Sequence, residues 1–215
     1  MTSRLVLAYA QREGGKPAVE RVLELAGCTG REAELLDERS WFSFDLKIRL
    51  FEALAEALDD PVVTRHAGEA ALDLSVGDGL KVALRALGSP RLVYQHIVRA
   101  NGKFSAIHDM ELLSLGRDRA TISFADNASV DYGVHRLDCE YNKGLLSVVP
   151  ALFGMGHAHV SHTACAAEGA DRCVYELSWQ HSRLTMRNTV ATGAAATAGV
   201  AAAALAAPAL LPVAA

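Results

Sequence analysis

The chain has 215 residues, of which 51% are hydrophobic, and its 21 lysines and arginines against 25 aspartates and glutamates give a formal net charge of -4. This length and composition predict one globular domain with an additional segment. No cluster of lysine and arginine is present, which argues against a nucleic-acid partner, because phosphate backbones are bound by basic surfaces. Four cysteines without an apolar signal region after Met1 indicate a reducing compartment, so we expect a cytoplasmic domain.

The first half of the chain is expected to be largely helical. Gly14-Gly15 separates two predicted helices, and Asp59-Asp60-Pro61 ends a long amphipathic one. The predicted helices cover residues 4–11, 17–26, 41–58, 61–72, 79–87 and 91–99. Cys28 follows the second helix with no other ligand type nearby, so we interpret it as a small buried residue.

Strand signals begin after residue 109. Residues 110–115 and 120–124 flank a glycine-containing hairpin connection, 134–139 is predicted as a third strand, and 144–153 as an apolar helix despite Pro150. A last hairpin is predicted from 157–165 and 173–179, in which Cys173, Tyr175, Leu177 and Trp179 share one face. We expect His157, His159 and His162 on one side of the first of these strands, as a solvated face or a second polar site. The predicted fold class is α+β, a helical N-terminal half followed by an antiparallel sheet with an apolar helix.

Three cysteines and one histidine in the second half suggest a metal site. Thiolate and imidazole are the ligands that Zn²⁺ prefers in closed tetrahedral sites. His162 lies three residues before Cys165, while Cys165 and Cys173 stand on either side of the hairpin turn. Cys139 would come from another strand, so the metal would tie that strand to the hairpin. The alternative is three buried free thiols and a surface histidine.

The end of the chain has a different composition. Residues 189–215 carry no charge and are rich in alanine, and the length suffices for a membrane-spanning helix, although Pro208 and Pro212 would kink or end it. Arg183 and Arg187 precede this stretch as positive flanks would if the domain faces the cytoplasm. We therefore expect residues 1–182 to form the domain and 183–215 a juxtamembrane linker with an inner-membrane anchor. The alternative is a flexible alanine-rich tail.

The segment from Cys139-Glu-Tyr-Asn-Lys-Gly144 to His162-x2-Cys165-x4-Ala-Asp-Arg-Cys173-x-Tyr175 resembles the C-terminal half of the 4-vinyl reductase-type domain. That family includes ligand-sensing domains of aromatic-responsive bacterial regulators and a bacteriochlorophyll biosynthesis protein. It shares its fold with heme-nitric-oxide-binding domains and with tethering subunits of the transport-protein-particle type. Members that sense aromatics hold zinc with three cysteines and an acidic residue. The resemblance thus implies a structural zinc bound by Cys139, Cys165 and Cys173, with His162 in place of the acidic ligand and Glu140 or Glu168 as fallbacks.

The resemblance also bears on function. No tyrosine of the chain begins the Tyr-x-Ser-x-Arg motif of heme-nitric-oxide-binding domains, so we expect no haem. We expect a sensory module without catalytic activity that binds a small hydrophobic or aromatic ligand. It would be the input part of a membrane-tethered signalling protein and would dimerise through the helices between Arg4 and Ala26. The alternatives are a tetrapyrrole vinyl reductase, for which no cofactor motif is visible, and an assembly or tethering scaffold.

Overall fold

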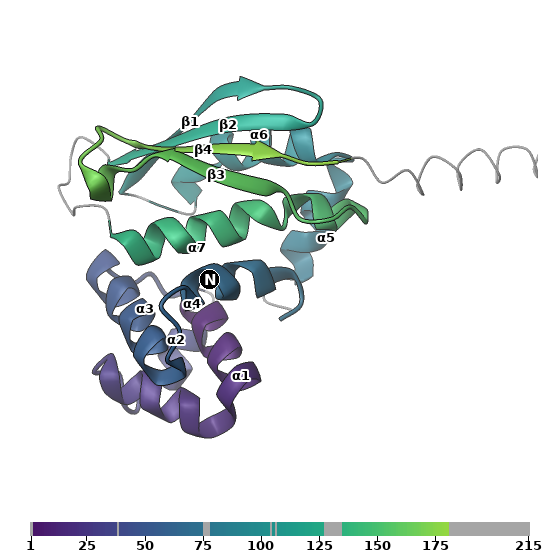
Figure 1. The fold of residues 1–215 in the computed structure, drawn as a ribbon. Helices are drawn as coiled ribbons and strands as arrows, with labels where there is room; N and C mark the ends of the chain where they lie inside the picture. The colour runs from purple at the N-terminus through teal and green to yellow at the C-terminus, as the bar shows by residue number, and fades with distance from the viewer. Residues whose placement is uncertain are drawn as a thin grey trace, which may run out of the picture. The chain divides into compact units, whose positions relative to one another are not determined.

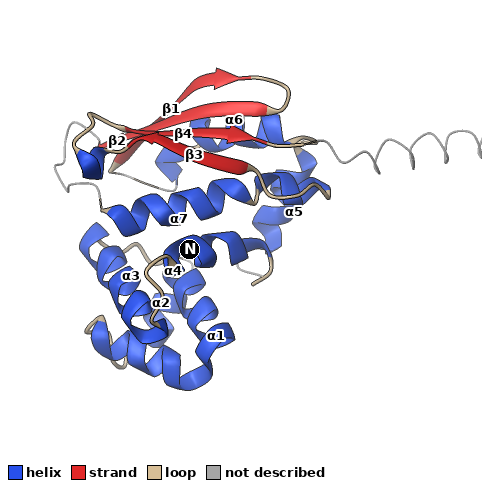
Figure 2. Ribbon diagram, viewed as in Figure 1, coloured by secondary structure: helices blue, strands red, loops and turns tan. Residues whose placement is uncertain are grey.

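Seven α-helices and four β-strands form in the part of the chain that the computed structural model describes, residues 2–37, 39–74, 78–103, 105, 107–126 and 135–180. The helices are α1 (Thr2–Leu25), α2 (Glu32–Leu36), α3 (Phe44–Leu58), α4 (Val63–Glu69), α5 (Asp78–Ala86), α6 (Pro90–Arg99) and α7 (Arg136–Ser147). The strands are β1 (His108–Leu115), β2 (Arg119–Asp126), β3 (His159–Ala164) and β4 (Cys173–Ser178). The α+β prediction is confirmed: helices dominate the first half, and strands follow (Figures 1 and 2).

Local capping and helix-breaking residues set several of the helix boundaries. Within α1 the backbone leaves helical geometry at Gly15, where φ is 65°, and this is the predicted break between two helical stretches. Ser43 and Ser89 cap α3 and α6, each accepting a hydrogen bond from the backbone N–H three residues later. Pro90 then occupies the first turn of α6, a position where a missing N–H costs nothing.

The strands form one antiparallel sheet in the order β1-β2-β4-β3. Two hairpins, β1–β2 and β3–β4, therefore lie side by side and join through their second strands. Along β4 the side chains of Cys173, Tyr175 and Leu177 are buried while Glu176 and Ser178 are exposed, which confirms the predicted alternation. Across the hairpin Tyr175 pairs with His162, so both side chains emerge on the same buried face.

Helix α7 lies between the sheet and the helices α1 to α4 (Figure 1). Its residues Leu137, Tyr141 and Leu145 recur every four positions and pack into the apolar core formed by α1, α3 and α4. On its other side Cys139 and Leu146 belong to a second core with α6 and the sheet. One helix thus contributes to both cores, and it carries a candidate metal ligand.

Two predictions for this region are wrong. The predicted strand over 134–139 is not formed, because α7 begins at Arg136 and contains Cys139. Val134 lies outside the described residues. The four-residue recurrence from Leu137 outweighs the two-residue alternation, and His135 begins the helix by accepting a hydrogen bond from the N–H of Leu137. The predicted helix over 144–153 is divided, because α7 ends at Ser147 and a 3₁₀ turn, Val149–Phe153, starts next to Pro150.

The alanine-rich segment and its basic flanks lie outside the described residues, which end at Gln180. Among the helices that are described, none combines the length and apolar character that a membrane span requires. The membrane anchor therefore stays a prediction.

Candidate metal centre

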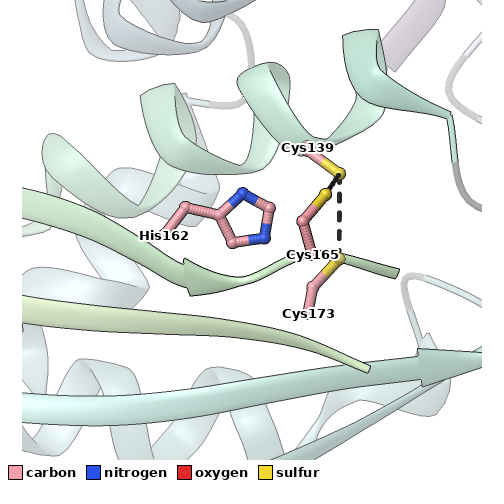
Figure 3. A group of neighbouring side chains, drawn as sticks. All are labelled: Cys139, His162, Cys165 and Cys173. Carbon is pink, nitrogen blue, oxygen red and sulfur yellow. Dashed lines mark hydrogen bonds between the residues drawn. The ribbon is translucent and has the colours of Figure 1, made fainter. Parts of the chain in front are cut away.

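Four side chains converge where α7 meets the β3–β4 hairpin (Figure 3). Cys139 comes from α7, His162 from β3, Cys165 from the position just after β3, and Cys173 from the start of β4. Their ligand atoms all lie within 4.8 Å of one another, and the three sulfurs belong to buried residues. The structure thus brings together the four residues that the sequence singled out.

The spacing of the sulfurs matches a tetrahedral zinc site. The Cys139 Sγ lies 3.9 Å from the Cys165 Sγ and 3.7 Å from the Cys173 Sγ. With Zn–S bonds of about 2.3 Å and tetrahedral angles, two sulfur ligands stand about 3.8 Å apart. The thiols therefore already occupy positions that a Zn²⁺ ion could bridge without rearrangement of the backbone.

The fourth corner is the imidazole of His162. Its Nε2 atom is buried and has no hydrogen-bond partner, and Figure 3 shows a ring nitrogen turned toward the sulfurs of Cys165 and Cys173. A buried nitrogen without a partner costs free energy, which a metal bond would recover. The donor set, three thiols and one imidazole nitrogen, fits zinc and leaves no position open for a substrate.

Hydrogen bonds polarise the thiols. The Cys139 thiol donates to Cys173, and this bond outweighs burial and lowers the pKa of Cys173. The backbone N–H of Ala166 and the electrostatic effect of the nearby His162 act in the same direction. The same pairing, followed by burial, raises the pKa of Cys139. Cys173 is therefore the first of the two to ionise, and a divalent cation would have to displace the proton that Cys139 retains.

The other candidate ligands lie elsewhere. Glu140 forms ion pairs with Arg65 and Lys143, and Glu168 is exposed beside Arg136. Cys28 is buried outside the cluster, with its Sγ 3.5 Å from the carbonyl oxygen of Ala26. These positions leave His162 as the fourth candidate among the described residues, ahead of both glutamates.

The other histidines do not form a second site with His162. His159 is exposed on β3, whereas His162 lies on the opposite, inner face, so the prediction that they share one side is wrong. Residues 159 and 162 differ by an odd number, and side chains alternate along a strand. His157 precedes β3 and is exposed.

A small cavity of about 10 Å³ adjoins the cluster, with room for about one water molecule. It was not anticipated from the sequence, because its walls come from the β1–β2 hairpin, α7 and β4. The lining residues are His108, Phe124, Ala125, Asp138, Cys139, Asn142, Cys173 and Tyr175.

His108 makes folding stability depend on pH. Burial lowers its pKa, and the positive charge of Lys47 acts in the same direction, against the opposing effects of Asp138, Asp126 and Cys173. Because the folded pKa is below the unfolded value of about 6.5, the unfolded chain binds more protons, and stability falls as the pH drops below about 6.5.

We expect His108→Gln to flatten this loss. The urea midpoints of the wild type and the variant are measured between pH 7 and pH 5. Both proteins carry the same cysteines and carboxylates, so a difference in their pH dependence reports on His108. Equal slopes for the two proteins would contradict the assignment to His108.

No protein-family model matches the chain, and no curated protein matches it. Solved structures do. The unliganded Fe(II) H-NOX protein from K. algicida matches with a TM-score of 0.61 at 12% identity, over 85% of this chain and 98% of that one. The H-NOX protein from S. oneidensis in the Fe(II)NO state matches with a TM-score of 0.59 at 15% identity, over 83% and 99%. An oxygen-binding H-NOX domain related to soluble guanylate cyclases gives 0.55 at 12%, over 82% and 92%. The chain has the fold of these domains.

This similarity bears directly on haem. It supports the predicted fold relationship with heme-nitric-oxide-binding domains, and it counts against the expectation, based on a missing motif, that haem is absent.

Two of the described histidines are turned toward polar groups of the protein. The Nδ1 of His108 lies 3.4 Å from Ser105 Oγ and its Nε2 lies 3.5 Å from Asp126 Oδ1, while the Nε2 of His162 faces the thiols. Of the remaining histidines in the described part, His135 is half-buried and the others are exposed: His66, His96, His157 and His159.

Proposed function

We propose that the chain is a sensory domain built around a structural zinc centre and that it binds a small hydrophobic or aromatic molecule. The H-NOX fold supports a domain that binds a small ligand, since the proteins with that fold are described in Fe(II), NO and oxygen-bound states. The observation that carries the zinc centre is the 3.7–3.9 Å separation of the thiols, which matches the edges of a ZnS tetrahedron.

The zinc would act as a cross-link. Cys139, His162, Cys165 and Cys173 would use all four coordination positions, so the ion would stabilise the fold without activating water or substrate. It would hold α7 against the β3–β4 hairpin, the two elements that supply the ligands.

Within this fold, the 4-vinyl reductase type is the assignment that we propose, with the sensed ligand enclosed between the helices and the sheet. The segment 183–215 would tether the domain 1–182 to the inner membrane, and α1 would mediate dimerisation. The alternatives with the same fold are a reductase, for which the sequence shows no cofactor motif, and a tethering scaffold.

Purification of the protein from its native host, followed by native mass spectrometry, tests the proposal. We expect about one zinc per chain and a small apolar or aromatic molecule that is released on denaturation. Turnover of a tetrapyrrole with a nicotinamide cofactor would instead establish the reductase.

Haem is the second candidate ligand, because the fold is that of H-NOX domains. An intense Soret band in freshly purified protein, which shifts on addition of nitric oxide, would establish it in place of the aromatic ligand. The zinc measurement stands independently of this result, since the four candidate zinc ligands are protein side chains.

A further inference from the structure

The candidate zinc centre carries a charge that the protein must stabilise. Three thiolates and one neutral imidazole around Zn²⁺ give a net charge of about -1, in a site whose three cysteines are buried. Buried charge requires hydrogen-bond donors. The backbone N–H of Ala166 supplies one donor, at 3.4 Å from the Cys173 sulfur.

Tyr175 is placed to supply a second donor. It lies in β4, two residues after Cys173, with 1% of its surface exposed. Its side chain and that of Cys139, the candidate ligand from α7, line the same small cavity beside the cluster. A phenol is protonated at neutral pH and donates its O–H to a thiolate. Tyr175 thus lies on the sheet beside the ligand that is farthest from it in sequence.

The ring of Tyr175 also fixes His162. The two rings stack with centroids 4.4 Å apart and planes inclined by 9°, and the two residues pair directly between β3 and β4. Tyr175 also packs edge-to-face against Phe124, with ring centroids 5.2 Å apart and ring planes at 83°. A ring held in this way restricts the plane of the imidazole, and in that plane Nε2 is buried and faces the thiols.

We propose that Tyr175 is a positioning residue of the metal centre, which orients His162 by stacking and stabilises the Cys139 thiolate by a hydrogen bond. The role rests on the proposed zinc site and extends it. Groups that contact metal ligands in this way orient them and raise metal affinity. The residue could have been noticed in the sequence, because it shares a strand face with Cys173, but its place beside His162 and Cys139 depends on the folded sheet.

Two variants of the 215-residue chain separate the role of the hydroxyl from that of the ring. Tyr175→Phe removes the donor and keeps the stack, and we expect zinc affinity to fall about tenfold, the lower end of the range for such contacts. Tyr175→Leu removes both, and we expect a loss of up to about 100-fold and a shifted d–d spectrum in the cobalt-loaded protein. Affinity is measured by competition with a chromophoric chelator.

Tyr94→Phe is the matched control. Tyr94 is fully buried in the same core, and its hydroxyl donates to the carbonyl of Leu146 rather than to a metal ligand. We expect wild-type zinc affinity and a wild-type cobalt spectrum from it. If both Tyr175 variants also bind zinc like the wild type, the positioning role is overturned while the zinc centre stands. If the wild type binds neither metal, the zinc centre fails and the role fails with it.

Discussion

Cys139→Ser should abolish stoichiometric zinc binding and lower the melting temperature by roughly 10 °C. A ligand held at about 1,000 times its Kd stabilises a folded protein by about 4 kcal/mol, and 1 kcal/mol shifts the melting temperature of a domain of this size by about 2–4 °C. Cys139 is the ligand from α7, whereas the other three belong to the β3–β4 hairpin. Its loss would therefore remove the cross-link between the two elements. Elemental analysis and thermal unfolding measure the two effects.

Cys28→Ser is the matched control for this change. Cys28 is as buried as Cys139 but lies outside the cluster. We expect full zinc content. The loss of folding stability should be limited to the effect of placing a hydroxyl where a thiol contacts the Ala26 carbonyl. A chelator should lower the melting temperature of this control to that of Cys139→Ser. Equal melting temperatures of the two variants in the presence of zinc would contradict the structural role of the metal.

Gly144→Ala should destabilise the protein by about 3 kcal/mol, at the upper end of the cost of overpacking. A β-carbon at Gly144 would overlap the carbonyl oxygen of Arg65 and come within 2.9 Å of the amide nitrogen of Glu69. These are backbone atoms of α4 and cannot rotate away. The substitution would push α7 from α4, and since α7 carries Cys139 we also expect weaker zinc binding. Chemical denaturation and chelator competition measure these changes.

Gly79→Ala serves as its control. Gly79 also lies in a helix, α5, but a β-carbon there meets nothing within 4 Å. Alanine is favoured over glycine in a helix by about 1 kcal/mol, so this variant should be unchanged or slightly more stable. If Gly144→Ala behaved in the same way, the close approach of α4 and α7 would not be a determinant of stability.

Ion pairs also hold α7 against the helical half of the domain, in addition to the close approach of α4 and α7 that Gly144 permits. Asp138 pairs with Lys47 of α3, whose ammonium group lies 5.5 Å from the ring centroid of Tyr141. Glu140 pairs with Arg65 of α4 and with Lys143. Burial opposes ionisation of Glu140, but the two cations outweigh it and lower its pKa. Both carboxylates flank Cys139 in sequence, so the residue that reaches the metal site is held on either side by the helical half of the domain.

The identity of the four candidate ligands and the secondary structure of the hairpin were predictable from the sequence. Cys165 and Cys173 flank a short turn, and the alternation along β4 places Cys173 and Tyr175 on one face, as the structure confirms. The break of α1 at Gly15 was equally local. Such features depend on neighbouring residues, and a single sequence shows them directly.

The tertiary structure decided which segments that are distant in sequence contact one another. Cys139 meets thiols 26 and 34 residues away, and it does so from a helix rather than from the predicted strand. The order β1-β2-β4-β3 and the glycine contact between α4 and α7 likewise join segments remote in sequence. Local periodicity specifies which face of an element is apolar. Which other element covers that face is settled by the burial and backbone fit of the whole core. For this reason the residues of the candidate metal centre could be named from the sequence, while their geometry and the stacking of Tyr175 on His162 could not.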